Sequence, residues 1–187
     1  MKLLVIALIV TTSSVAFAQP KTSPGAGPAV VVVETEKGTF EFETYPNEAP
    51  KTVAHILELV NKRFYNGQRV HRVVPGFVVQ TGALSSRKAP LTQKQRPFVQ
   101  NLPPEFNPTP HEAGILSMAR GDAPDSAQTS FFICLGKASS LDNKYTVFGR
   151  VVDGMPVVEA LAKVPLNGEE PVTRVEITRV RIVPPAP

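Results

Sequence analysis

The stretch Val70–Gly82, with the sequence VHRVVPGFVVQTG, decides the fold of this chain. Valine and phenylalanine dominate it, and these residues favour β-strands, in which neighbouring side chains point to opposite faces. Pro75 and Gly76 interrupt the pattern, because proline lacks a backbone N–H and a Pro-Gly pair is typical of turns. We therefore expect a strand over Val70–Gln80 that is broken by a bend or loop at Pro75-Gly76.

Short strands of the same kind are predicted on both sides of this stretch. Val30–Val33 is an apolar run, and the alternation at Phe40 and Phe42 after the turn at Lys37-Gly38 indicates a hairpin. Further strands are expected over Ile115–Ala119, Phe131–Leu135, Tyr145–Val152 and Val175–Ile182. The alternation in the last of them slips by one residue, which predicts a β-bulge.

Two helices are predicted among the strands. The first has one apolar face with helical spacing, made by Val53, Ile56, Leu57, Val60 and Phe64. The second is shorter and has its apolar face at Val157, Leu161 and Val164. Many short strands avoid exposed edges best by closing into a barrel. The sequence therefore predicts a mainly β protein with one domain over residues 30–183.

Both ends of the chain are predicted to lie outside this domain. Lys2, the apolar run Leu3–Val10 and the small-x-small sequence Ala16-Phe17-Ala18 fit a cleaved signal peptide over residues 1–18. The apolar run is far shorter than the about 20 residues that span a bilayer. Residues 19–29 predict a flexible linker, and 184–187 form a Pro-rich tail. We expect a periplasmic or secreted protein that has no membrane segment in its mature form.

The composition argues against several classes of function. The formal net charge of +4 is scattered, without a block of like charges, so no nucleic-acid partner is expected. Cys134 is the only cysteine, and its apolar neighbours predict a buried, unreactive thiol. The chain has no phosphate-binding glycine loop and no H-E-x-x-H zinc motif, and we expect neither a metal nor another cofactor.

Four blocks of the sequence carry a resemblance to a known family. Val70–Gly82 resembles the signature F-H-R-x-x-P-G-F-x-x-Q-G-G of the cyclophilins. Gly114–Ala119, Ser130–Ile133 and Tyr145–Val151 resemble three further cyclophilin blocks, in the same order and spacing. Over essentially the whole predicted domain, the chain is thus similar to the cyclophilin-type peptidyl-prolyl cis/trans isomerases, and most like their bacterial periplasmic branch.

This resemblance implies a fold, a site and a substrate. The fold is a closed eight-stranded antiparallel β-barrel capped by two α-helices, with the active site on its outer wall. Arg72 would be the catalytic residue. The residues implied to bind substrate are Phe77, Val78, Gln80, Ala119, Arg120, Gly121, Gln128, Phe132, Leu141 and Tyr145. The substrates would be proline-containing segments of unfolded or flexible proteins. The enzyme would be a monomer that assists the folding of exported proteins.

An arginine beside an apolar pocket suits this reaction. Rotation about an X–Pro amide is slow, because the planar amide must lose its resonance. In the twisted state the prolyl nitrogen recovers its lone pair, and a permanently charged donor such as Arg72 binds that state better than the planar one. As strand neighbours, Phe131 and Phe132 must face opposite sides, and the family motif assigns Phe132 to the proline pocket.

Three positions depart from the family pattern. Ser130 stands where the family has a second glutamine, so either Gln128 reaches round to replace it or one contact to the substrate backbone is weaker. Ser140 stands where many eukaryotic members have a tryptophan, and this chain has none. Tyr145 stands where a histidine often lines the pocket, so we expect activity to change little between about pH 6 and 8.

Two other functions compete with isomerisation. A hydrolase is disfavoured, because the chain has no G-x-S-x-G motif and only His55, His71 and His111 could serve as a base. A peptide-binding module or holdase chaperone that keeps the barrel but lacks catalysis stays open. Its mark in the sequence would be the loss of the arginine, and Arg72 is present.

Overall fold

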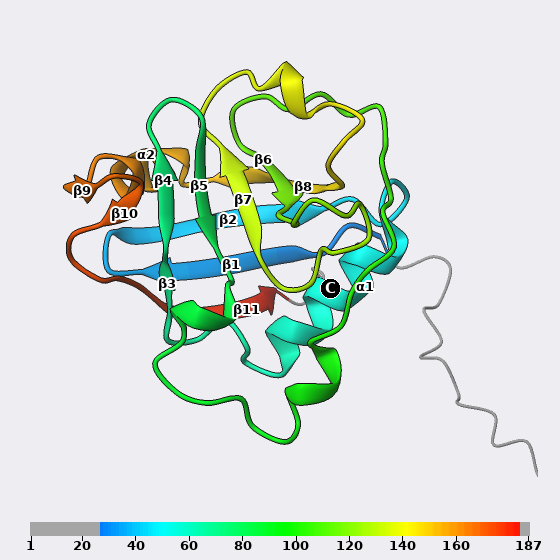
Figure 1. Cartoon of the computed structure of the whole chain (residues 1–187), viewed down its shortest axis with the longest axis horizontal. Coiled ribbons are helices and arrows are strands. Elements are labelled where there is room, and N and C mark those ends of the chain that lie inside the picture. The colour runs from blue at the N-terminus through cyan, green and yellow to red at the C-terminus, as the bar shows by residue number, and fades with distance from the viewer. Residues whose placement is uncertain (1–26, 184–187) are drawn as a thin grey trace, which may run out of the picture.

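The computed structural model describes residues 27–183, which Figure 1 shows as a barrel of strands with two helices and long surface connections. The predicted signal peptide (1–18), residues 19–26 of the predicted linker and the predicted tail (184–187) lie outside the described residues. No helix in the described part of the chain is both long and apolar enough to span a bilayer.

Eleven strands, two α-helices and three short 3₁₀ helices make up the described chain. The strands are β1 (Val30–Thr35), β2 (Gly38–Thr44), β3 (Gln68–Val70), β4 (Arg72–Val74), β5 (Val78–Thr81), β6 (Ile115–Met118), β7 (Phe131–Cys134), β8 (Val147–Asp153), β9 (Leu166–Asn167), β10 (Glu170–Pro171) and β11 (Val175–Val183). The helices are α1 (Pro50–Asn61), α2 (Met155–Ala162), η1 (Leu84–Ser86), η2 (Arg96–Phe98) and η3 (Ser139–Leu141).

Nine of the strands form one sheet in the order β3-β11-β1-β2-β8-β6-β7-β5-β4, and every neighbouring pair is antiparallel. The two ends of this order, β3 and β4, follow each other in the chain and are separated only by His71. The sheet therefore curls into a nearly closed barrel, which removes most unpaired strand edges. The predicted fold is confirmed, with nine strands in place of the eight expected.

The extra strand arises at His71. Val70 pairs with β11, whereas Arg72 pairs with Gln80 of β5, so the chain changes partners between them. The single strand predicted over residues 70–80 is thus divided at a barrel corner and again at the turn around Pro75. The hairpin β4–β5 that results lies with one face on the outside of the barrel.

The last strand, β11, carries the bulge that the sequence predicted. Glu34 of β1 pairs with Arg179, and the next residue, Thr35, pairs with Ile177, so Thr178 is the extra residue. Because of this bulge, Ile177 and Val180 both lie in the barrel core, although they are three positions apart and a regular strand would point them to opposite faces.

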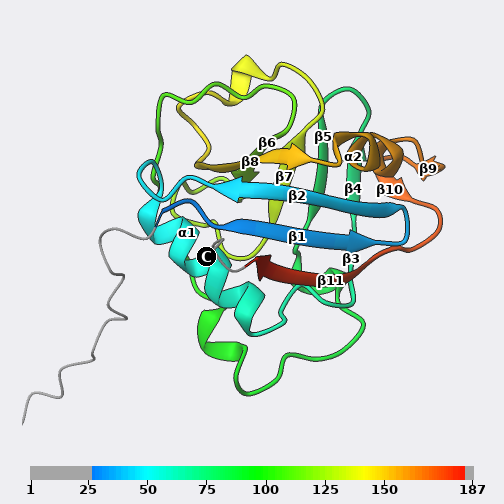
Figure 2. The ribbon, with the colours of Figure 1, turned by 180° about the vertical axis from the view of Figure 1, so that it is seen from behind.

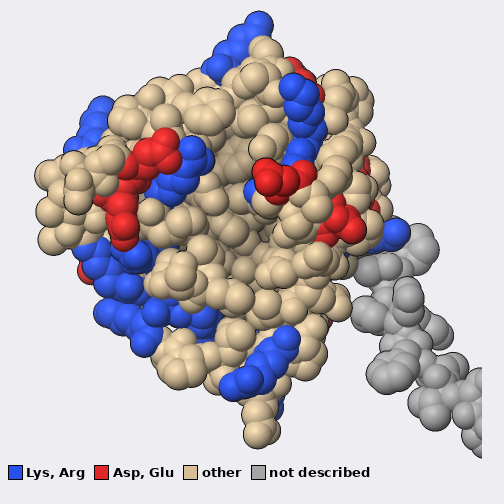
Figure 3. Space-filling model, in the orientation of Figure 1, with Lys and Arg blue, Asp and Glu red and all other residues tan. Residues whose placement is uncertain are grey.

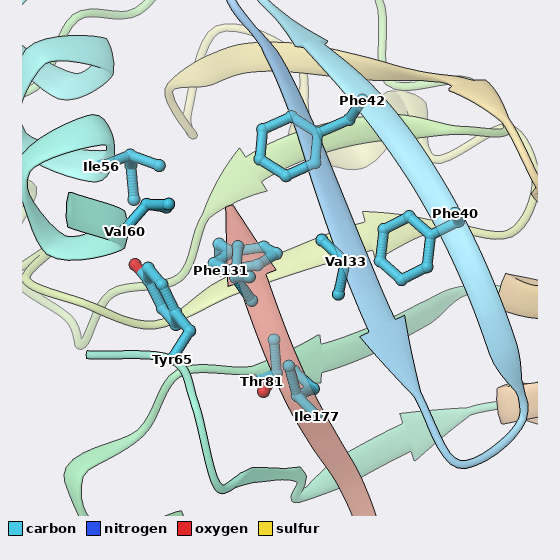
Figure 4. A pocket seen from close by; sticks show the side chains of 10 residues that line it. Val33, Phe40, Phe42, Ile56, Val60, Tyr65, Thr81, Phe131 and Ile177 are labelled. Atoms are coloured by element: carbon cyan, nitrogen blue, oxygen red, sulfur yellow. The ribbon is translucent and has the colours of Figure 1, made fainter. Parts of the chain in front are cut away.

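Side chains fill the inside of the barrel, as Figure 4 shows. Val33, Phe40, Phe42, Ile56 and Phe131 are among the residues around a cavity of only about 20 Å³. That volume is roughly the space of one water molecule. The interior is therefore a packed core, and a peptide can be bound only on the outside.

Helix α1 covers one end of the barrel beside β11, as the two ribbon views show (Figures 1 and 2). The predicted apolar residues Val53, Ile56 and Val60 are buried, whereas Leu57 is only partly buried. Phe64 lies beyond the end of the helix and is also buried. The predicted helix face thus packs on the core as expected, with its last residue in the loop that follows.

Candidate functional site

A hollow of about 190 Å³ lies on the outer wall of the barrel, over β4, β5 and β7. These strands face the viewer in Figure 1, and Figure 3 shows that side of the molecule as a largely uncharged centre with charged side chains around it. The residues that line the hollow are Arg72, Phe77, Val78, Gln80, Ala119, Arg120, Phe132, Leu141 and Tyr145. All nine are predicted site residues, which the fold brings together from distant parts of the chain.

Strand alternation places the lining side chains of β5 and β7 outside the barrel. On β7, Phe131 lies in the main core, whereas its neighbour Phe132 packs in a second apolar cluster with Val78 and Cys134. On β5, Val79 belongs to the main core, and Val78 belongs to the outer cluster. The period of two puts Phe131 and Phe132 on opposite faces, and the outer one is Phe132, as the family motif implied.

The floor of the hollow is apolar and rigidly packed. Phe132 is buried, and its ring meets that of Tyr145 edge to face, with centroids 5.8 Å apart. The ring of His111 stacks against Phe132 at 6.1 Å. Phe77 and Leu141 are partly buried and pack against this cluster. The result is an apolar recess open to solvent on one side, the kind of surface that an apolar ring can fill.

Arg72 stands at the polar edge of the recess and is held from two directions. Its Nη1 donates to Oε1 of Gln80 at 3.2 Å, across the β4–β5 pair. Its Nε donates to Oε2 of Glu169 at 2.6 Å, and its Nη2 donates to Oε1 of the same carboxylate at 3.4 Å. The hydrogen bonds from Arg72 lower the pKa of Glu169 below its ordinary value. Glu169 is a residue that sequence reasoning missed.

Ser130 takes part in the same network from β7's side of the recess. Its hydroxyl donates to the carbonyl of Thr81 at 2.8 Å and accepts from Nε2 of Gln80 at 3.3 Å. A row of side-chain hydrogen bonds therefore connects Ser130 through Gln80 to Arg72. The serine that replaces the expected glutamine fixes the amide of Gln80, so that its oxygen faces the arginine.

Arg120 forms the opposite wall of the recess together with Tyr145. Its guanidinium lies over the Tyr145 ring, 4.6 Å from the centroid, and donates to the carbonyls of Gly121, Asp122 and Lys144. The carbonyl contacts fix the long side chain, and the stacking is a cation–π contact. The resemblance implied that Arg120 lies on the edge along which the backbone of a bound peptide runs, and the structure places its side chain in the wall of the hollow.

Two predicted site residues do not line the hollow. Gly121 is exposed, and its N–H donates to the Ser126 hydroxyl at 2.9 Å. The side-chain amide of Gln128 donates to Oδ1 of Asn101 at 2.7 Å. The carbonyl of Gln128 is tied to His55 Nε2 at 3.0 Å, which directs this segment toward helix α1. Gln128 therefore does not take over the place of the missing glutamine.

A Ser–His–Asp arrangement lies behind the recess. Nδ1 of His111 is 2.9 Å from Oδ1 of Asp142, and its Nε2 is 3.0 Å from Oγ of Ser117. The Ser117 side chain is fully buried, and its hydroxyl donates to the carbonyl of Thr146 at 3.0 Å. A nucleophile must reach its substrate. This network is therefore a buried support for Phe132, and it offers no site for hydrolysis.

The other chemically reactive groups of the described chain are not assembled into a site. Cys134 is free and buried, as predicted, and burial raises the pKa of its thiol to about 12. Within residues 27–183, no three side chains of His, Cys, Asp or Glu come together in a way that could hold a metal ion.

The family model described as cyclophilin type peptidyl-prolyl cis-trans isomerase/CLD matches residues 30–182. The chain is 43% identical over 158 residues to peptidyl-prolyl cis-trans isomerase CYP23 of Arabidopsis thaliana. This alignment covers 83% of this chain and 70% of that protein.

Solved structures agree with the fold. A cyclophilin-type peptidyl-prolyl cis-trans isomerase from Cryptosporidium parvum matches with a TM-score of 0.75 and 24% identity, over 86% of this chain and 100% of that one. The structure of the same protein in the presence of the dipeptide Ala-Pro matches with a TM-score of 0.73 and 25% identity, over 83% of this chain and 99% of that one. The chain therefore belongs to the cyclophilin family and is a peptidyl-prolyl cis/trans isomerase.

Proposed function

We propose that the hollow on the outer wall binds the proline ring of a flexible peptide and that Arg72 stabilises the twisted amide. The observation that carries this proposal is the position of the Arg72 guanidinium at the edge of an apolar recess, on the same hairpin as Phe77 and Val78. The ring fixed in the recess would remain still while the residue before proline rotates.

The charge of Arg72 would act on the atoms that change in the reaction. The prolyl nitrogen gains a lone pair as the amide twists, and a donor fixed in advance at this place favours the twisted state over both planar ones. No covalent bond is made or broken, so neither a nucleophile nor a metal is required. Gln80 and Ser130 would orient the arginine or bind the peptide backbone at the same edge.

The substrate class is supported by one of the related structures. The Cryptosporidium parvum isomerase was determined in the presence of the dipeptide Ala-Pro. By analogy, proline-containing segments of unfolded or flexible proteins are the proposed substrates of this chain. The remaining wall residues, Ala119, Arg120 and Tyr145, would contact the peptide on either side of the proline.

The test is the rate of cis/trans exchange in a short Ala-Pro peptide, measured by NMR without a coupled protease. Arg72→Ala should lower the catalysed rate by on the order of a hundredfold or more, because a preorganised donor to the transition state is lost. Arg69→Ala is the matched control, since Arg69 lies on the adjoining strand β3 and does not line the hollow. Its rate should stay close to that of the unaltered protein.

Peptide binding must be measured alongside the rate. If the unaltered protein binds the peptide but does not accelerate its exchange, the chain acts as a peptide-binding module or holdase and the catalytic proposal fails. If Arg72→Ala keeps the full rate while its barrel stays folded, another group stabilises the twisted amide.

The cellular role proposed here is the folding of exported proteins by a periplasmic or secreted monomer, as in the bacterial periplasmic branch. The support is the signal-peptide pattern of residues 1–18. Expression of the whole chain in a bacterium, followed by fractionation and mass spectrometry, tests this directly. A mature protein that begins at Gln19 in the periplasm is expected, and an unprocessed chain in the cytoplasm would contradict the proposal.

A further inference from the structure

The contact between Arg72 and Glu169 comes from a small hairpin that sequence reasoning missed. Strands β9 and β10 are two residues long and are joined by Gly168 and Glu169. Gly168 has a φ of +63°, a conformation that favours glycine and is needed at the first position of many two-residue hairpin turns. Glu169 thus stands at a defined point of a tight turn.

This hairpin is docked on the free edge of β4. The backbone N–H of Val73 donates to the carbonyl of Glu169 at 2.7 Å, on the side of β4 that does not face β5. An ion pair between Glu170 and Arg69 of β3 lies beside this contact, but the Glu170 side chain is more than half exposed, and such a surface pair contributes little to holding the hairpin. The backbone of Glu169 is therefore fixed to the strand that carries Arg72. This places its carboxylate within hydrogen-bond distance of the guanidinium.

The Glu169 carboxylate and Gln80 bind three of the N–H groups of Arg72 and leave two others without these partners. An arginine side chain has five N–H groups. Glu169 accepts from Nε and from Nη2, and Gln80 accepts from Nη1. One N–H on each terminal nitrogen has no acceptor among these partners. These two groups are therefore available to donate to a bound peptide.

We propose that Glu169 is a positioning residue, whose carboxylate holds one edge of the Arg72 guanidinium so that its two remaining N–H groups face the bound prolyl amide. This inference rests on the proposed function, because it needs Arg72 to act on the substrate. It goes further by assigning part of the catalytic arrangement to a turn that lies 97 residues away in sequence.

The expected effect of this contact is on rate rather than on stability. The side chains of Arg72 and Glu169 are 38% and 57% exposed, and ion pairs at such exposure contribute little to folding. Without Glu169, Gln80 would be the remaining side-chain partner of the arginine, at 3.2 Å. A reacting group that is displaced by about 1 Å can lose much of its rate advantage, so fixing the guanidinium has a direct effect on turnover.

Other charged groups surround the Arg72–Glu169 pair, and the experiment must distinguish their effect on the rate from that of Glu169. Arg69, Glu170 and His71 lie on the same barrel corner or the same hairpin. Burial, followed by the charges of Arg69 and Arg72, lowers the pKa of His71, while Glu170 raises it. A substitution of Glu170 therefore changes the local charge as much as one of Glu169, but it leaves Arg72 with its partner.

The experiment compares Glu169→Ala and Glu169→Gln with Glu170→Gln as the matched control. NMR exchange with an Ala-Pro peptide gives the rate at saturation and the peptide affinity separately. Glu169→Ala should lower the saturated rate about tenfold, Glu169→Gln should lower it less, and peptide affinity should stay within about twofold. Glu170→Gln should keep the rate of the unaltered protein.

The Nε–H resonance of Arg72 gives an independent readout of the contact. In the unaltered protein and in Glu170→Gln, this proton should exchange slowly with water, because it is bound to a carboxylate. In Glu169→Ala it should exchange fast. Loss of protection in that variant without a loss of rate would mean that the contact is structural only.

The outcomes separate this inference from the proposed function. If Arg72→Ala is slow but Glu169→Ala is as fast as the unaltered protein, Glu169 does not position the arginine and the proposed function stands. A faster Glu169→Ala would mean that the carboxylate restrains Arg72, which also overturns the inference. If Arg72→Ala keeps the full rate, both the function proposed for Arg72 and the role of Glu169 fall.

Discussion

The carboxylate of Glu105 accepts the backbone N–H of Thr52 at 2.8 Å, and thus caps the first turn of α1 from the long connection between β5 and β6. The same carboxylate accepts the N–H of Lys51 at 3.0 Å. The residue at the helix N-cap is Ala49, which makes no side-chain cap. Glu105 therefore joins two parts of the molecule that the sequence separates widely, and its charge also suits the positive end of the helix dipole.

Glu105→Ala should lower the free energy of unfolding by about 1 kcal/mol, the usual cost of losing a helix cap. Two N–H groups at the helix start would then have only water as a partner. Glu112→Ala is the control, because Glu112 is an exposed acid in the same connection. Chemical denaturation measures both variants, and an equal loss in both would show that the cap contributes nothing specific.

Asp142→Asn should destabilise the protein at neutral pH and cease to do so in acid. Hydrogen bonds from the backbone and ring of His111 lower the pKa of Asp142 in the folded protein. A folded-state pKa below the unfolded one stabilises the fold above the unfolded pKa, and this stabilisation disappears as the pH falls through the folded pKa. The difference between the two proteins should therefore shrink as the pH falls below about 4.

The measurement is the free energy of unfolding of both proteins across this acid range. Asp153→Asn, which changes an exposed carboxylate at the end of β8, is the control and should change the free energy of unfolding little. A constant difference between Asp142→Asn and the unaltered protein down to the lowest pH would show that the carboxylate charge is not what matters. Because His111 supports Phe132, the variant should also bind proline peptides less tightly.

The parts of the site that the sequence predicted are those that depend on strand period. Val78 and Phe132 could be assigned to the outer wall, because alternate residues of a strand share a face and the motif fixes which face it is. The barrel itself follows in the same way from many short apolar strands. Even the bulge at Thr178 is visible in the sequence as a slip in alternation.

The parts that the sequence did not predict depend on contacts between distant segments. Glu105 and Glu169 act through hydrogen bonds to residues far away in the chain, and no local period marks either of them. The direction of Gln128 is decided by Asn101 and His55, which a strand pattern cannot show. The nearest signal for the β9–β10 hairpin is Gly168, but strands of two residues are too short to show alternation.

Cys134 should be inert in the folded enzyme. Its side chain is fully buried under the recess, and burial raises the pKa of the thiol to about 12, so that almost no thiolate is present at pH 8. An aromatic disulfide reagent should react with Cys134 roughly a hundredfold more slowly in the folded protein than in denaturant. Rapid modification of folded protein, measured by absorbance, would show that the floor of the recess opens.

The rate of isomerisation should be nearly constant between about pH 6 and 8, and Tyr145→His should introduce a pH dependence in this range. Burial lowers the pKa values of both His55 and His71, so these groups stay largely neutral at neutral pH. A histidine at position 145 would lie under the Arg120 guanidinium, which disfavours its protonation. Its titration should therefore appear at the acidic end of the range, and below that pH the enzyme should be slower or bind peptide more weakly.

Tyr145→Phe is the control, because it keeps the ring but cannot titrate. Its rate should change as little with pH as that of the unaltered protein. A step near pH 6.5 in the unaltered enzyme would contradict this prediction, because it would mean that a group of the unaltered protein with the pKa of an ordinary histidine controls the rate.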